Sequence, residues 1–205
     1  MLIQISEGEA LDRLSILEIK YNRICNPLQM TEIQKEIYSL SDIYPLKEKY
    51  ILYYKLLIFI NSVIWDKTNY AKETIEINSK YGENAYEIFE HNQQRFRIKN
   101  SINYSENSNV KEQKSYLKKQ ITFAIKSNQS VEKILHLLSY LLITYDHVEI
   151  FQNDYLLIYN DLIRNFLPSL SIVNYTKNLI INDFDIVMPE TYHSELHTII
   201  SSIIH

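Results

Sequence analysis

Glycine is very scarce in this chain, which has only Gly8 and Gly82 among its 205 residues. Phosphate-binding loops of the Walker type and dinucleotide-binding fingerprints each need several closely spaced glycines, because backbone amides must approach the phosphate groups. Neither loop can be built from this sequence. We therefore predict neither of these nucleotide-binding folds and no bound cofactor.

Cysteine and long apolar runs are also scarce. The single cysteine, Cys25, excludes a disulfide within the chain and is typical of a reducing compartment. No run of about 18 apolar residues is present, so we expect no membrane span. The first residues show no basic region followed by a small-residue cleavage site, so we expect no secretion signal. Together these features favour a cytoplasmic protein.

The chain carries no excess of positive charge. Lys and Arg total 21 and Asp and Glu total 25, which gives a formal net charge of −4. The 17 tyrosines are spread along the chain and do not interleave with a basic stripe. Proteins that bind nucleic acid without sequence preference usually present such a basic surface. We therefore expect no nucleic-acid partner.

The hydrophobic pattern predicts a mainly α protein with two domains. Residues 1–118 should form a bundle of long helices, with helices beginning near Ser6, Thr31 and Leu46 and a last one over residues 83–103, after a stop at Gly82. Beyond residue 118, short strands at 119–125, 147–151, 170–173 and 185–188 alternate with helices at 131–145, at 154–166 and from 190. This alternation predicts that residues 119–205 form a small α/β domain with a short parallel sheet.

The first helix has an unusual acidic residue on its apolar side. Ser6 and Glu9 form a capping-box pattern at its start, and residues such as Leu11 and Leu14 gather on one arc. Asp12, Arg13 and Lys20 fall on the opposite, polar side. Glu18 lands inside the apolar arc, so its carboxylate must find a partner or shift its pKa.

The helix expected at 83–103 also carries polar groups on its apolar arc, namely Asn92, Arg95, Lys99 and Asn103. If this helix packs against the first one, we expect Glu18 to meet these side chains. One interpretation is a buried ion pair that only fixes helix register. The other is an anion-holding cleft, in which Arg95 offers a planar fork and Lys99 a point charge. Glu112 and Lys114 either rim that cleft or form an ordinary solvated pair.

Two histidines, His193 and His197, lie one helical turn apart, a spacing that can bind zinc. However, Glu195 is not next to the first histidine, and the sequence offers no obvious third ligand. We therefore interpret the pair as surface histidines and predict no metal site.

Three stretches resemble a family of uncharacterised small bacterial proteins whose first helix reads similarly to "ISVGELLDKITILEIK". The stretches are residues 5–20, residues 92–103, and Ser108 with residues 112–116, and they cover about residues 1–118. Glu7 stands where the family usually has a small apolar residue. The resemblance marks as motif positions Asp12, Arg13, Glu18, Lys20, Asn92, Arg95, Lys99, Asn103, Glu112, Lys114 and Tyr116.

Members of that family occur beside, or fused to, sugar-transfer proteins. The resemblance therefore implies a role in surface-polysaccharide biosynthesis. The missing catalytic motifs and the long apolar helices favour a non-catalytic accessory or interaction module, and the polar cluster makes a nucleotide sugar or another phosphate-bearing molecule its candidate ligand. We also expect self-association or a glycosyltransferase partner. One alternative is a sugar-transfer enzyme that uses a nucleotide sugar, with Arg95 and Lys99 on a phosphate and Glu18 or Asp12 as base. The second alternative is an oligomeric scaffold in which the polar cluster sets helix register.

Overall fold

The structure is a computed structural model that describes residues 4–74, 78–114, 119–125, 130–152, 154–167, 170–173 and 190–204. The chain divides into two compact units, Met1–Glu112 and Gln113–His205. The boundary expected from composition lies a few residues later, between residues 118 and 119. The prediction of a mainly α fold with a short parallel sheet is confirmed.

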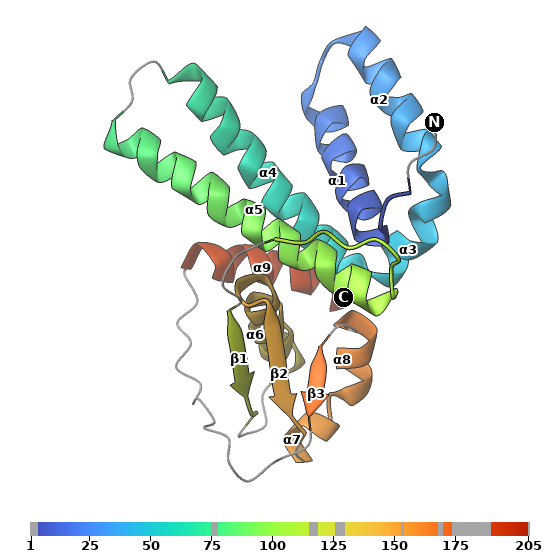
Figure 1. The fold of residues 1–205 in the computed structure, drawn as a ribbon, viewed down its shortest axis with the longest axis vertical. Helices are drawn as coiled ribbons and strands as arrows, with labels where there is room; N and C mark the ends of the chain where they lie inside the picture. Colours follow the sequence, from blue (N-terminus) through green and yellow to red (C-terminus); the bar gives the residue numbers. More distant parts are fainter. Residues whose placement is uncertain are drawn as a thin grey trace. The chain divides into compact units, whose positions relative to one another are not determined.

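Long helices make up the first unit (Figure 1). They are α1 (Glu7–Arg23), α2 (Pro27–Ser39), α3 (Tyr44–Lys49), α4 (Ile51–Glu73) and α5 (Ser79–Ser105), with a 3₁₀ turn η1 at Ser41–Ile43. The helices α4 and α5 lie side by side, α1 packs against both of them, and α2 packs against α1. Among the residues that the structure describes, no helix is long and apolar enough to cross a membrane.

The helix starts follow capping chemistry, once as predicted and once not. Ser6 caps α1, because its Oγ accepts a hydrogen bond from the Glu9 backbone N–H at 3.3 Å. The predicted start at Thr31 is wrong. Helix α2 begins four residues earlier, at Pro27, where the Asn26 side chain accepts from two backbone N–H groups and proline's fixed φ suits the first turn.

Gly82 does not end a helix, so that prediction is also wrong. Helix α4 stops at Glu73, and α5 starts at Ser79 under an Asn78 cap and continues through Gly82. The Asn78 Oδ1 accepts from the Tyr81 backbone N–H at 3.0 Å. A helix interior tolerates one glycine at a cost of about 1 kcal/mol, so a well-capped start nearby decides the boundary.

The core of the first unit is built around α4. Its run of apolar residues is covered by α1, α5 and α3, as expected for a helix that is hydrophobic nearly all round. Among the described residues of this unit, the largest fully buried side chains include Leu11, Leu14, Tyr50, Leu52, Tyr53, Leu56, Leu57, Ile60, Ile98 and Ile102. This core fixes α1 between α2 on one side and the α4–α5 pair on the other.

The second unit is a small parallel sheet with helices. Its elements are β1 (Gln120–Phe123), α6 (Val131–Thr144), β2 (His147–Phe151), α7 (Asp154–Leu157), α8 (Asn160–Phe166), β3 (Ser171–Val173) and α9 (Glu190–Ile204). The described strands pair in parallel in the order β1-β2-β3, with Ile121 opposite Val148 and Ile150 opposite Ile172. The helix expected at 154–166 is split into α7 and α8, and the strand expected at 185–188 lies outside the described residues. Helix α6 packs against β2 and α9.

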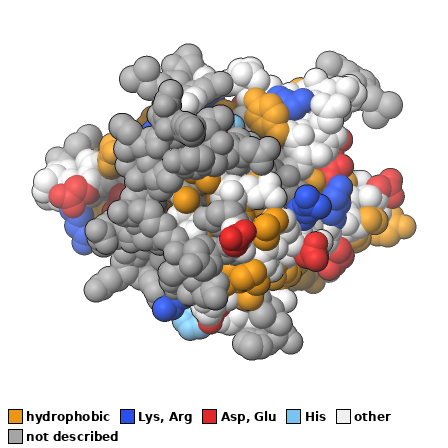
Figure 2. Space-filling model, turned by 90° about the horizontal axis from the view of Figure 1, so that it is seen from below, with side chains coloured by type: hydrophobic (Ala, Val, Ile, Leu, Met, Phe, Trp, Pro, Cys, Tyr) orange, Lys and Arg blue, Asp and Glu red, His pale blue; other side chains and the backbone are white. Residues whose placement is uncertain are grey.

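The surface carries charge of both signs. Figure 2 shows one face of the molecule, on which acidic (red), basic (blue) and hydrophobic (orange) side chains are all exposed. Several of the exposed charged side chains form ion pairs, for example Lys35 with Glu32 at 2.7 Å. Such exposed pairs contribute little to stability.

Candidate functional site

The polar groups of the first unit meet in the contact between α1, α4 and α5, and Asp12 lies at their centre. The Asn61 side-chain amide on α4 donates to Asp12 Oδ1 and also bonds Ser15 Oγ, each at 2.8 Å. The Asp12 side chain is only 4 % exposed. The prediction that Asp12 lies on a polar face is therefore wrong. Helix α1 is covered along a second row, Gly8, Asp12, Ser15 and Ile19, because it packs against more than one neighbour.

Lys99 of α5 is surrounded by carboxylates. Its Nζ lies 2.8 Å from Glu9 Oε2, 2.9 Å from Glu112 Oε2 and 3.9 Å from Asp12 Oδ2, and its side chain is 8 % exposed. Burial alone would lower the pKa of Lys99, but the hydrogen bonds with Glu112 and Glu9 raise it above the ordinary value. Lys99 is therefore a charged group that links α5 to α1 through Glu9 and Asp12, and its expected role as a phosphate-binding cation stays a prediction.

The environment of Asp12, unlike that of Lys99, disfavours the charged form of the side chain. Burial raises its pKa above the ordinary value, and the nearby Arg95 guanidinium, the Asn61 hydrogen bond and the Lys99 charge offset this only in part. Burial of the ionised Asp12 carboxylate therefore costs free energy, which the groups around it reduce. Removal of any one of these groups should lower the free energy of unfolding.

The first turn of α1 lies directly against α5 at Gly8. The Gly8 backbone N–H donates to Asn103 Oδ1 at 2.7 Å. A Cβ at this position would lie 2.3 Å from the Lys99 carbonyl oxygen and 2.8 Å from Asn103 Oδ1. Gly8 thus allows the backbones of α1 and α5 to approach closely, and the Asn103 side chain hydrogen-bonds across this contact. The Ser108 hydroxyl, which hydrogen-bonds Glu7, adds a further link.

Glu18 does not join this cluster, and that prediction is wrong. Its Oε1 lies 2.8 Å from Lys47 Nζ, which comes from α3. The same ammonium lies 4.6 Å from the centre of the Tyr54 ring, and burial together with the Glu18 charge raises the pKa of Tyr54. The short helix α3, which contacts α1, supplies a nearer cation than α5 does.

The remaining predicted residues are dispersed. Arg13 pairs with Glu36 of α2 at 3.0 Å on the exposed surface, and Asn92 donates to the Ile88 carbonyl of its own helix at 2.8 Å. Lys20 is half-buried on α1, Lys114 falls in the second unit, and Tyr116 lies outside the described residues. Of the expected set, the structure thus brings together Asp12, Arg95, Lys99, Asn103 and Glu112.

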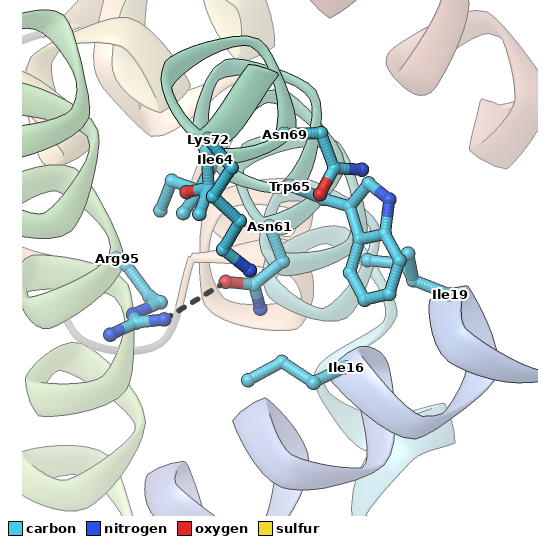
Figure 3. Close-up of a pocket in the computed structure, with 9 residues that line it drawn as sticks. Ile16, Ile19, Asn61, Ile64, Trp65, Asn69, Lys72 and Arg95 are labelled. Atoms are coloured by element: carbon cyan, nitrogen blue, oxygen red, sulfur yellow. Dashed lines mark hydrogen bonds between the residues drawn. The ribbon is translucent and has the colours of Figure 1, made fainter. Parts of the chain in front are cut away.

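A pocket of about 210 Å³ adjoins this cluster on the Arg95 side, between α1, α4 and α5 (Figure 3). It is lined by Ile16, Ile19, Asn61, Ile64, Trp65, Thr68, Asn69, Lys72 and Arg95. Arg95 Nη1 donates to Asn61 Oδ1 at 3.3 Å, and Arg95 Nε is 3.9 Å from Asp12 Oδ2. No carboxylate lines the described walls. The pocket is therefore suited to a small anion that also has an apolar side.

The α4 residues of this pocket, above all Asn61, Trp65 and Lys72, are missing from the sequence prediction. Positions 61, 65, 68 and 72 have the spacing of one helix face, but most residues of α4 after Ile60 are non-aliphatic, so the sequence does not single out this row. Because this row faces α1 and α5, it forms a wall of the pocket.

Comparison with models of known protein families gives no match, and comparisons with curated proteins and with solved structures give none either. The comparisons thus name no relative for this chain. The function has to be argued from the site itself.

Proposed function

We propose that the first unit binds a small phosphate-bearing sugar ligand and acts as a non-catalytic accessory module in surface-glycan biosynthesis. The observation that carries this proposal is the Arg95 side chain in an otherwise mainly apolar pocket, with Lys72 as a second cation in the lining. A guanidinium is well suited to phosphate, since its planar fork offers paired donors. The glycan context rests on the resemblance of the first helix.

The size of the pocket limits the ligand. Sites for drug-sized molecules have volumes of about 300–1,000 Å³. A pocket of about 210 Å³ is smaller than that range. It suits a sugar phosphate, or only the sugar-phosphate end of a nucleotide sugar. The Trp65 side chain and the isoleucines would contact the apolar face of the sugar, while Asn61 and Asn69 would hydrogen-bond its hydroxyl groups.

The lining favours binding over catalysis. A general base must lie within about 2.6–3.2 Å of the proton it takes. Of the two bases considered, Glu18 is held by Lys47, and Asp12 is buried and hydrogen-bonded to Asn61. Neither of them is part of the described pocket lining.

Replacement of Arg95 by methionine is expected to weaken binding of the ligand by about 10- to 100-fold, because a charge-assisted hydrogen bond contributes about 1.5–3 kcal/mol. Titration calorimetry of the full chain with inorganic phosphate, hexose 1-phosphates and nucleotide sugars measures this change. We expect the hexose phosphates to bind more tightly than inorganic phosphate, since only they fill the apolar part of the pocket.

Arg13→Met is the matched control, since it removes the same charge from the exposed surface of α1. It should leave the affinity unchanged. Arg95→Met should destabilise the fold more than Arg13→Met does, because the guanidinium lies 3.9 Å from the buried Asp12 carboxylate and offsets its charge, so affinities are compared at a temperature where both variants are folded. Equal affinities for wild type and Arg95→Met would refute the proposal, as would equal losses in both variants.

A further inference from the structure

A second group of polar side chains, unrelated to the pocket, gathers between α6 and α9 of the second unit. It consists of Glu132 and His136 on α6 and His197 on α9. One ligand atom from each residue lies within 4.8 Å of the other two. Glu132 Oε1 is 2.8 Å from His197 Nδ1, and the two imidazole rings meet edge to face with their centres 5.6 Å apart.

The helical geometry explains the convergence. Positions 132 and 136 are one turn apart, so both side chains lie on the same face of α6. Helix α9 packs against α6, which brings His197 to that face. In the sequence, His193 lies one turn before His197, and no third ligand is obvious nearby. The His193 side chain lies outside the described residues, and the ligands that meet His197 come from a helix about 60 residues earlier.

The cluster has one buried and two accessible members. His136 is 5 % exposed and lies on a helix whose neighbouring residues are mostly buried leucines and isoleucines. The side chains of Glu132 and His197 are about half exposed. A polar ring inside an apolar helix contact is costly unless it is engaged. The accessible pair would let an ion reach it from solvent.

We propose that Glu132, His136 and His197 bind a divalent transition metal ion, with Zn²⁺ as the best-suited metal. Zinc is held by imidazole nitrogen and carboxylate oxygen at about 2.0–2.2 Å. Ligand atoms at these distances in a tetrahedral arrangement lie about 3.3–3.6 Å apart, so small side-chain rotations complete the site. Three protein ligands leave a fourth position for water. The bound ion would join α9 to α6.

Glu132 and His197 also have hydrogen-bond partners that need no metal. His197 Nδ1 also lies 2.8 Å from Ser201 Oγ, and Ser201 Oγ lies 3.3 Å from Glu132 Oε1. In that case the cluster would be a local hydrogen-bonded pair with a ring contact. The two possibilities differ in whether the chain binds one equivalent of metal.

Titration of the chelator-treated full chain with Zn²⁺, and with Co²⁺ followed by its visible absorption, tests the proposal. Wild type should bind one ion per chain. Glu132→Gln and His197→Gln should each weaken binding about tenfold or more, because even outer partners of a metal site change affinity by about 10- to 100-fold. Both residues are half exposed, so these variants should fold even if the buried His136→Gln variant does not.

His147→Gln is the matched control. His147 also pairs with a carboxylate, Glu149, at 3.1 Å, but no third ligand joins them among the residues searched. Its replacement should leave the affinity unchanged. The proposal is overturned if wild type shows no saturable one-to-one binding, if His147→Gln weakens binding as much as His197→Gln, or if His193→Gln abolishes binding while Glu132→Gln retains it.

Discussion

Replacement of Lys99 by methionine is expected to lower the free energy of unfolding of the first unit by about 3–5 kcal/mol, the usual cost of leaving a buried charge without its partner. Lys99 is the cation shared by Glu9, Glu112 and Asp12. The two glutamates are partly exposed and can regain water. Asp12 cannot, since it would keep only Asn61 at 2.8 Å and Arg95 at 3.9 Å.

Urea unfolding followed by tryptophan fluorescence measures this effect, because Trp65 is the single tryptophan and lies in the first unit. Lys35→Met is the control, as it removes an exposed pair and should change stability by less than about 0.5 kcal/mol. The double variant Asp12→Asn, Lys99→Met should recover part of the loss, since it removes the buried charge as well. If Lys99→Met lowered the free energy of unfolding no more than Lys35→Met does, Lys99 would not be the buried counter-charge of Asp12.

The difference in free energy of unfolding between wild type and Lys99→Met should also grow as the pH rises. Burial holds the pKa of Asp12 above its ordinary value, so the folded protein binds this proton more tightly than the unfolded chain does. The stability from that proton is complete below the ordinary pKa of about 4 and is lost as pH rises through the folded value. Loss of the Lys99 charge raises the Asp12 pKa further and deepens the loss at neutral pH. Unfolding at several pH values between 4 and 8 should show the difference, and Asp12→Asn in the same background should abolish most of it.

The pattern of hydrophobic residues was enough to predict the helices and the parallel sheet, but it failed to place Asp12. The reason is that periodicity assumes one buried face for each helix. Helix α1 packs against α2 on one side and against α4 and α5 on another, so the row that contains Asp12 is buried as well. Only the number of neighbours decides this, and a single sequence does not give that number.

The partners of charged residues were even harder to predict from the sequence. Glu18 was correctly singled out as a carboxylate among apolar residues, but its cation, Lys47, comes from a short helix that has no apolar row of its own. In the same way, the residues that meet His197 lie on α6, far away in the sequence. Spacing along one helix identifies ligands that share a face. It is silent about which other helix packs against that face.

Replacement of Gly8 by alanine tests the closest approach in the first unit, and we expect it to lower the free energy of unfolding by about 2–3 kcal/mol. The added Cβ would lie 2.3 Å from the Lys99 carbonyl oxygen, so α1 must move away from α5 and weaken the Gly8–Asn103 hydrogen bond. The higher helix propensity of alanine offsets this by at most about 1 kcal/mol.

The only other glycine provides the control. Gly82 also lies within a helix, but a Cβ there would meet no atom within 4 Å. Gly82→Ala should therefore stabilise the chain by about 0.5–1 kcal/mol, because alanine loses less backbone freedom on folding. Opposite signs for the same chemical change, measured by Trp65 fluorescence in urea, would separate close packing from helix propensity. If both variants gained stability, α1 and α5 would not be in contact at Gly8, and the arrangement of Lys99 with Asp12 would lose its structural basis.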